Sequence, residues 1–166
     1  MKEIKLTQGK VAIVDDEDFE RLNQNKWCAH WDGYNWYAIR RRSCVEGKQI
    51  ILFMHRVIMN TPPLVHTDHR DGEGLNNCKE NLRICTHQEN QHNRKLPHKN
   101  NKLGVKGVIW DKKQKKFRTQ IGFNGKTIHL GYFTVLADAV QDYRVAEIKY
   151  FGEFAREETK KLYQIV

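Results

Sequence analysis

The last third of the chain carries the pattern that most restricts its fold. Three strand-like runs, "GVIWDKK", "KFRTQIGF" and "KTIHLGYF", follow one another and are separated by short polar turns. The turn between the second and third runs is Asn124-Gly125, a dipeptide typical of a two-residue hairpin. Short runs joined by tight turns pair as antiparallel neighbours, so this segment predicts a three-stranded antiparallel sheet.

A helix is expected directly after the third run. Apolar side chains recur there at the spacing of one helical face, at Ala139, Tyr143, Ala146 and Tyr150. Thr134 is a candidate N-cap and Gly152 a candidate C-terminal stop. The pattern therefore predicts one helix packed across the back of the sheet.

The first sixty residues also mix strands with short helices. "KVAIVDDEDFERL" indicates a strand, an Asp-rich cap and a short helix, and "WCAHWDGYNWYAIRRRS" indicates a hairpin. "KQIILFMHRVIMN" indicates a strand that runs into a helical segment, which "TPP" at residues 61–63 then breaks. Together with the C-terminal pattern, these elements predict an α+β protein.

The charge of the chain indicates a polyanionic partner. The 166 residues carry a formal net charge of +9, with a sequence pI near 9.4. Nucleic acid is the first candidate for so basic a chain. The longest apolar run, "IILFM", is far too short to span a bilayer, and the first ten residues lack the apolar region of a signal peptide. We therefore expect a cytosolic protein, or a nuclear one in a eukaryote.

The distribution of basic residues and the spacing of the cysteines limit the possible partners further. The segment between Arg94 and Arg118 is rich in Lys and Arg and contains a single acidic residue, Asp111. Residues 95–104 within it are predicted to form a basic linker. Interleaved aromatic residues in the strands favour contact with nucleic acid over a merely solvated face. Free thiols are expected rather than a disulfide framework or a Cys-rich zinc site, because no CxxC pair occurs among Cys28, Cys44, Cys78 and Cys85.

The segment "VHTDHRDGEGLNNCKENLRICTHQEN", residues 65–90, concentrates imidazole, carboxylate and amide groups. Hydrolysis of a phosphodiester needs a base that takes a proton from water and a cation that stabilises the developing charge. Asp68-His69 supplies both residue types side by side, at the end of a strand-like run. Adjacent strand residues point to opposite faces, so the pair can serve one site only if the chain bends at "RDGEG".

Two asparagines complete this constellation. Asn81 begins "NLRICT", which predicts a second strand. Asn90 follows "THQE", where Thr86 and Glu89 have the spacing of a capping box at the start of a helix. Asn90 is therefore expected in the first turns of that helix, able to face the hairpin.

Residues 54–94 resemble the HNH nuclease family, through "DH…ENLR…THQEN" and the lead-in "HRVIMNTPP". The version is similar to that of phage and intron-encoded homing endonucleases. The resemblance implies a ββα-metal fold, a hairpin and a helix around one divalent ion. It also implies His69 as general base, Asp68 and Asn90 as metal ligands, and Asn81 as a support that fixes the loop and orients His69 by hydrogen bonding.

The sequence departs from two patterns of that family. It lacks the CxxC pairs of the zinc-supported branch, and Asn90 replaces a final His. An amide oxygen suits a hard cation better than zinc, so Mg²⁺ is expected, with Mn²⁺ as a substitute. His66 and His87 are candidates to bind the scissile phosphate, whereas Cys78 and Cys85 favour packing over zinc ligation.

The C-terminal module resembles the DNA-binding domain of plant apetala and ethylene-response factors, through "GV…W…K…KFRTQI…NGK…HLGYF" and "YRVAEIKYFGEFA". In that family the three-stranded sheet enters the major groove of DNA. The positions carried over as DNA-facing are Lys106, Trp110, Lys115, Arg118, Gln120 and Lys126. Lys106 stands where Arg is usual, which argues against a bidentate guanine contact there. Arg118 is the candidate for base readout.

We therefore expect a site-directed DNA endonuclease of the HNH homing type, encoded by a phage or mobile element and acting in the cytoplasm of a bacterial host as a monomer or homodimer on DNA. The expected parts are an N-terminal α+β part (1–60), the nuclease (54–94), the linker (95–104) and the DNA-recognition module (105–158). One alternative is a non-cleaving, sequence-specific DNA-binding regulator. Another is a zinc-stabilised binding module that uses His66, Cys78, Cys85 and His87.

Overall fold

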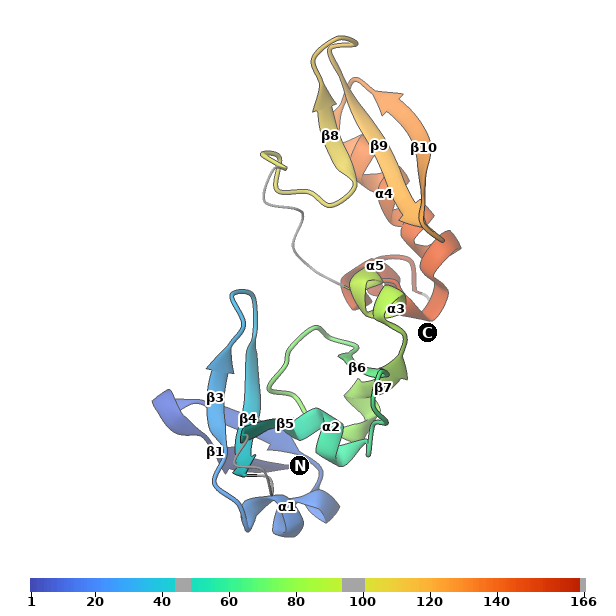
Figure 1. Ribbon diagram of the computed structural model, residues 1–166. Coiled ribbons are helices and arrows are strands. Elements are labelled where there is room, and N and C mark those ends of the chain that lie inside the picture. The colour runs from blue at the N-terminus through green and yellow to red at the C-terminus, as the bar shows by residue number, and fades with distance from the viewer. Residues whose placement is uncertain (44–48, 94–100, 165–166) are drawn as a thin grey trace. The chain divides into compact units, whose positions relative to one another are not determined.

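The chain forms two compact units, Met1–Asn90 and Gln91–Val166, each with its own elements (Figure 1). The computed structural model describes residues 1–43, 49–93 and 101–164, so Cys44 and most of the predicted linker lie outside the described residues. Both units combine helices with small antiparallel sheets, which confirms the predicted α+β class. Within the described ranges, no helix has the length and apolarity needed to cross a membrane.

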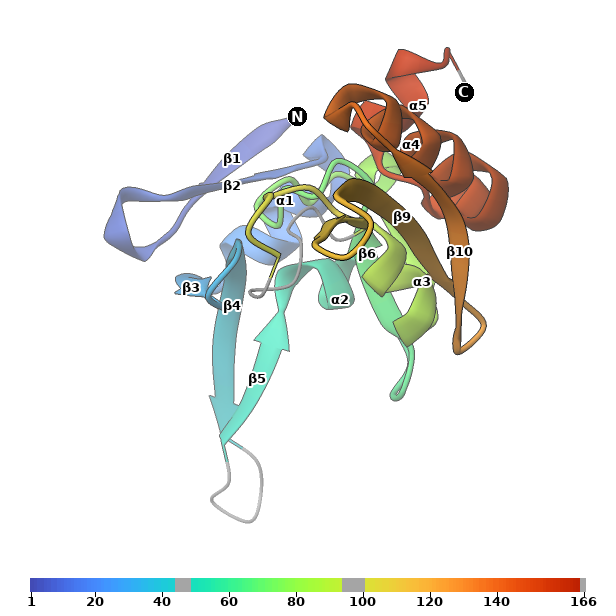
Figure 2. The ribbon, with the colours of Figure 1, turned by 90° about the horizontal axis from the view of Figure 1, so that it is seen from above.

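The first unit is built from two small sheets, a hairpin and short helices. β3, β4 and β5 form a three-stranded antiparallel sheet, in which β4 and β5 run side by side as a ribbon (Figure 2). The elements are β1 (Lys2–Lys5), β2 (Val11–Val14), α1 (Asp16–Asn23), β3 (Cys28–Trp31), β4 (Trp36–Ser43), β5 (Gln49–Phe53), α2 (Met54–Ile58), β6 (His66–His69), β7 (Leu82–Cys85) and α3 (His87–His92), which ends just inside the second unit.

The N-terminal elements and the central hairpin share one hydrophobic core. Leu82 of β7 is buried in the same cluster as Ile4, Val14, Leu22, Trp27 and Met54. Full burial of such a side chain contributes roughly 1.5–3 kcal/mol each. The sequence predicts an N-terminal part and a nuclease motif as separate segments, and that division stays a prediction, but the described residues of both stabilise a single core.

The loop between β6 and β7 is held against the N-terminal strands. Ile13 of β2 donates its backbone N–H to the Leu75 carbonyl (2.9 Å) and accepts one from Asn77 (2.8 Å). Gly74 lies so close to β4 that a Cβ there would approach the Trp36 carbonyl oxygen to 2.4 Å. Although its sequence reads as a flexible Gly-rich turn, this loop is therefore fixed by backbone bonds and close packing.

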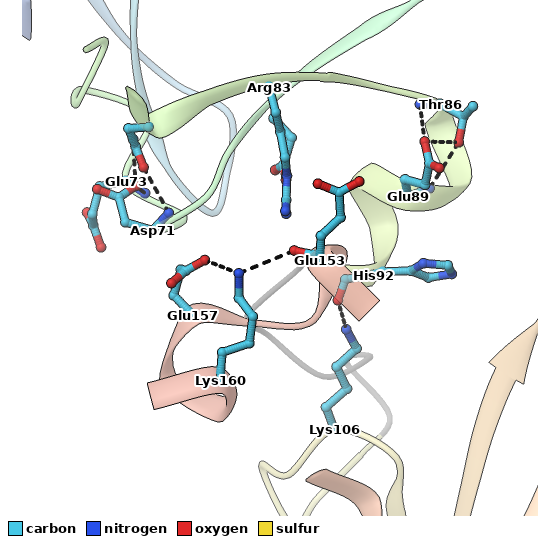
Figure 3. A network of polar contacts seen from close by, with 12 residues as sticks. Asp71, Glu73, Arg83, Thr86, Glu89, His92, Lys106, Glu153, Glu157 and Lys160 are labelled. Carbon is cyan, nitrogen blue, oxygen red and sulfur yellow. Dashed lines mark hydrogen bonds and ion pairs between the residues drawn. The ribbon is translucent and has the colours of Figure 1, made fainter. Parts of the chain in front are cut away.

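The start of α3 confirms the predicted capping box (Figure 3). The Glu89 carboxylate accepts hydrogen bonds from the Thr86 backbone N–H (2.8 Å) and from its hydroxyl (2.9 Å). The Thr86 hydroxyl oxygen accepts one from the Glu89 backbone N–H (3.3 Å). These reciprocal bonds satisfy donors that a helix start leaves unpaired and set where α3 begins.

The second unit is the predicted three-stranded sheet with one long helix behind it (Figure 1). Asn124 and Gly125 have positive φ angles of 49° and 71°, as a two-residue hairpin turn of this kind requires. The long helix has its N-cap at Val135, one residue after the predicted Thr134, and no side chain caps it. The elements are β8 (Val108–Asp111), β9 (Lys116–Phe123), β10 (Lys126–Phe133), α4 (Leu136–Phe151) and α5 (Glu157–Leu162).

A buried carboxylate joins α5 to α4, an arrangement that the sequence pattern does not predict. Glu147 is fully buried, and both its oxygens accept hydrogen bonds from Arg156, at 2.8–3.1 Å. Thr159 of α5 donates its hydroxyl to the same carboxylate at 2.9 Å. Because an unpaired buried charge is costly, these partners are needed for Glu147 to be tolerated there.

Candidate functional site

β6 and β7 place Asp68 and His69 at the end of a regular hairpin. In the antiparallel register Asp68 lies opposite Arg83, and His69 lies opposite Leu82. Neighbouring strand residues point to opposite faces, so the two side chains diverge within β6. The bend that the sequence leads us to expect comes after His69, where Gly72 N–H bonds back to the His69 carbonyl at 2.9 Å.

Asp68 is held by a buried ion pair. Arg83 donates two hydrogen bonds to Oδ2 of Asp68, from Nε at 2.9 Å and from a terminal nitrogen at 2.6 Å. Both residues are 6% exposed. Charge-assisted bonds of this length fix the orientation of the carboxylate. Both bonds go to Oδ2 of Asp68, the residue predicted to bind a metal ion.

His69 is buried among aromatic rings of the N-terminal elements. Its ring lies edge to face with that of His55 (centroids 4.9 Å apart) and 6.0 Å from that of Tyr37. Burial lowers the pKa of His69, while a hydrogen bond to Asn77 acts in the opposite direction. Burial also lowers the pKa of His55, to about 3. Both imidazoles are therefore held in the neutral form, which for His69 is the form that accepts a proton.

The family resemblance implies that Asn81 fixes the loop and orients His69. The Asn81 amide donates to Asp71 Oδ1 (2.9 Å) and to the Asn76 carbonyl (2.8 Å), and its oxygen accepts from the Asp71 N–H (3.0 Å). It therefore fixes the loop. Oδ1 of Asn77 lies 3.5 Å from Nε2 of the His69 ring.

Asn90 lies in the first turns of α3, as predicted. Its backbone N–H donates to the Thr86 carbonyl at 3.1 Å, and its side chain is half-buried. The capping box at Thr86 and Glu89 thus sets the position of Asn90 relative to the end of β7. Asp68 and Asn90 together offer a carboxylate and an amide oxygen, the donor types that a hard cation prefers.

The four residues of the zinc alternative have different surroundings. The His66 and His87 rings lie 5.1 Å apart, and Cys85 pairs with His66 across the hairpin. Cys78 instead interacts with Asp15. Throughout residues 1–43, 49–93 and 101–164, no three His, Cys, Asp or Glu side chains are grouped so as to hold a metal ion. Whether the chain uses zinc stays a prediction.

The six predicted DNA-facing residues do not share one face of the C-terminal sheet. Val108, Phe117 and Ile121 belong to the core beneath α4 and define the inner face. Trp110 pairs with Phe117 and so lies on the inner side, whereas Arg118 pairs with Ile109 on the outer side. The outer face carries Lys116, Arg118, Gln120, Thr127, His129 and Tyr132.

The predicted lysines also differ in their surroundings. Lys115 and Lys126 are exposed at the two turns of the sheet. Lys106 instead donates to the His92 carbonyl at 2.6 Å, and its Nζ lies 5.7 Å from the centre of the Phe151 ring (Figure 3). The Lys106 ammonium group therefore already makes a hydrogen bond within the second unit. Of the residues carried over, Arg118 and Gln120 are therefore the pair that shares the outer face.

Sequence reasoning missed the residues that surround the predicted ones. Arg83 lies within the quoted "ENLR", and strand alternation from Asn81 would have placed it across from Asp68 only if the register were known. His55 lies in the lead-in "HRVIMN", but no local signal connects it with His69. His129 and Tyr132 share the face of Arg118 because β10 has a register shift between His129 and Gly131, which strand alternation alone does not predict.

Two known proteins are similar to this chain. An uncharacterized HNH endonuclease of Acanthamoeba polyphaga mimivirus is 30% identical over 151 residues, which span 89% of this chain and 74% of the relative. "Protein 3.8" of Escherichia phage T7 is 34% identical over 95 residues, 57% of this chain and 77% of the relative. Neither a protein-family model nor a solved structure matches the chain. The extent of the similarity to the mimivirus protein shows that the chain belongs to the HNH endonuclease family.

Proposed function

We propose that the chain is a site-directed DNA endonuclease of the homing type that hydrolyses phosphodiester bonds at the β6–β7–α3 unit. His69 takes the proton from the attacking water. Its burial supports this role, because it holds the imidazole neutral and able to accept a proton near pH 7. The observation that carries the proposal is the burial of His69 at one end of the β6–β7 hairpin, in which Arg83 of β7 also fixes the Asp68 carboxylate.

The same unit suits a hard divalent cation. Asp68 and Asn90 would hold it through oxygen donors, and Mg²⁺ or Mn²⁺ needs few protein ligands because it keeps several waters. Arg83 bonds to Oδ2 of Asp68 and so fixes the orientation of this carboxylate. When bound, such a cation would stabilise the charge on the phosphate and on the leaving oxygen. Asn81 keeps the loop in place beside these groups.

The outer face of the C-terminal sheet is proposed to deliver the nuclease to duplex DNA. Arg118 carries the cation and the fork of donors that reads guanine, and Gln120 lies two positions along the same face. His129 and Tyr132 lie across from Gln120 and Arg118 and extend that polar surface. The excess of basic residues over the whole chain supports a polyanionic partner.

A cleavage assay tests the proposed activity directly. Purified protein is incubated with supercoiled plasmid in the presence of Mg²⁺ or of EDTA, and conversion to nicked or linear DNA is measured on gels. Cleavage is expected only with the metal. If DNA is bound but never cut with Mg²⁺ or Mn²⁺, the non-cleaving regulator becomes the correct interpretation.

The role of His69 is tested by His69→Ala. The cleavage rate is expected to fall by about 10²- to 10⁴-fold, the usual contribution of a general base, while DNA affinity changes little. His30→Ala is the matched control, because His30 is an exposed histidine on β3. A loss of DNA binding in His69→Ala, or an equal loss of cleavage in the control, would refute the assignment.

A further inference from the structure

We propose that the two-stranded ribbon formed by the end of β4 and the start of β5 binds the DNA duplex beside the cleaved bond, with Arg41 as its phosphate contact. The inference deepens the proposed nuclease function and rests on duplex DNA being the substrate. It gives the first unit a DNA-binding element of its own, in addition to the sheet of the second unit.

The charge of the first unit favours a local contact with DNA over a general attraction. Residues 1–90 contain thirteen Lys and Arg and thirteen Asp and Glu, so the formal charge of this unit is zero. A neutral unit that holds a polyanion needs a patch of positive charge where the polyanion lies. Residues 15–20 carry five of the acids, whereas residues 40–42 are three consecutive arginines.

The arginines lie where the sheet of the first unit narrows from three strands to two. In the described sheet, β3 pairs with β4 as far as Ile39, and Arg40 to Ser43 pair with β5 alone. Figure 2 shows this ribbon extending beyond α2. The major groove of B-DNA is about 12 Å wide and admits a two-stranded ribbon. The element that carries the arginines is therefore one that can enter a DNA groove.

Strand alternation separates the three arginines. Arg40 is engaged within the first unit, because it donates to Asn25 and its guanidinium lies 5.4 Å from the centre of the Trp27 ring. Arg41 and Arg42 are both exposed. Adjacent strand residues point to opposite faces, so these two side chains leave the ribbon on opposite sides. Only one of them can share a face with the nuclease hairpin.

Arg41 is the arginine on the face of the nuclease hairpin. Tyr37 and Ile39 lie four and two positions before it on β4 and therefore point to the same side. The Tyr37 ring lies 6.0 Å from the ring of His69, at the end of β6. Ile51 of β5 lies opposite Arg41 and is exposed. One face of the sheet thus extends from the end of β6 to Arg41 and Ile51.

The spacing along β4 fits a duplex that passes both positions. Four residues separate Tyr37 from Arg41, which is about 13 Å at the usual rise of a strand. Phosphates of one DNA strand follow each other at about 3.4 Å along the helix axis, so this length corresponds to about four base pairs. When the duplex follows the ribbon, Arg41 therefore meets a phosphate that flanks the cleaved bond.

A pair of neighbouring substitutions tests which face meets DNA. Binding of the full-length protein to labelled duplex DNA is measured in EDTA at several salt concentrations. Arg41→Gln is expected to reduce the slope of log affinity against log salt by about one, the loss of one phosphate contact. Arg42→Gln removes the same charge from the opposite face and should leave the slope unchanged. Equal slopes for the two variants would overturn the proposal.

A second pair adds a charge instead of removing one. Ile51→Glu places a carboxylate beside Arg41 and is expected to weaken binding by about tenfold or more, through repulsion of the phosphates. Ile50→Glu gives the same net charge on the opposite face and should weaken binding less. The two isoleucines are 47% and 46% exposed, so neither change disturbs the core, and circular dichroism checks the fold. A larger loss in Ile50→Glu would place DNA on the other face and refute the assignment of Arg41.

Failure of the nuclease function is recognised separately, because binding in EDTA needs no cleavage. Cleavage of plasmid with Mg²⁺ is measured on the same preparations. If the protein binds DNA with the slope that depends on Arg41 but never cuts, the nuclease function fails and the ribbon contact stands. If Arg41→Gln binds and cuts as the unmodified protein does, the ribbon contact alone is refuted.

Discussion

At the scale of single residues, the buried Asp68–Arg83 ion pair contributes to the stability of the first unit. Two opposite charges are buried face to face on neighbouring strands, joined by bonds of 2.6 and 2.9 Å. Removing both charges from such a pair is often neutral, whereas removing one leaves the other unpaired away from water. A substitution of Arg83 therefore acts on Asp68 as well.

Arg83→Met is expected to lower the free energy of unfolding by about 3–5 kcal/mol, because it leaves the Asp68 carboxylate buried without its guanidinium partner. Urea unfolding followed by circular dichroism measures the change. The double variant Asp68→Leu with Arg83→Met should recover most of the loss. A cost below about 1 kcal/mol in the single variant would mean that the pair behaves as an exposed one.

The buried histidines make stability depend on pH. The pKa of His55 is lowered from 6.5 to about 3 and that of His69 is also lowered, so between these values the unfolded chain binds more protons than the folded one. Stability is therefore complete above about pH 6.5 and is lost as the pH falls toward 3. Thermal unfolding across this range should show a falling Tm. His55→Phe, which keeps a ring and removes the titrating group, should flatten the curve.

At the scale of elements, alternation along β8, β9 and β10 decides which residues can act together. Trp110 and Arg118 look equally accessible in a sequence of interleaved aromatic and basic residues. The register separates them, because Trp110 pairs with Phe117 on the helix side and Arg118 with Tyr132 on the other. Only the outer side is free of α4, so a ligand that covers the sheet meets Arg118.

Arg118→Ala is expected to weaken binding of duplex DNA by about 1–3 kcal/mol and to relax its sequence preference. Trp110→Ala is the matched comparison on the opposite face and should change affinity less. Fluorescence anisotropy with labelled DNA, recorded in EDTA, measures both. A larger effect of Trp110→Ala would mean that DNA meets the helix-side edge of the sheet.

At the scale of the whole molecule, the chain is strongly basic, which favours a polyanionic partner. A formal net charge of +9 on 166 residues favours association through phosphate contacts, which release counterions. Each unit has its own core, so the charge acts through two separately stabilised bodies.

Affinity for duplex DNA is expected to fall steeply with salt, by about a thousandfold or more between roughly 50 and 200 mM if six or more phosphates are contacted. Titrations at several salt concentrations, plotted on logarithmic axes, give the slope and hence the number of contacts. A flat dependence would contradict binding driven by the basic residues.

The sequence by itself determined what neighbours along the chain decide. The Asn124-Gly125 turn and the Thr86–Glu89 capping box depend on interactions within a few residues, and the structure confirms them. The adjacency of Asp68 and His69 is likewise a property of the sequence.

Only the tertiary structure decided what surrounds those residues. Arg83 meets Asp68 because the hairpin register is set by long-range pairing, and Asn77 meets His69 because the loop is bonded to β2. His55 reaches the same imidazole because α2 packs into the core that β7 shares. Burial of apolar surface, which is non-directional and acts between distant segments, brings these groups together, and no local pattern records it.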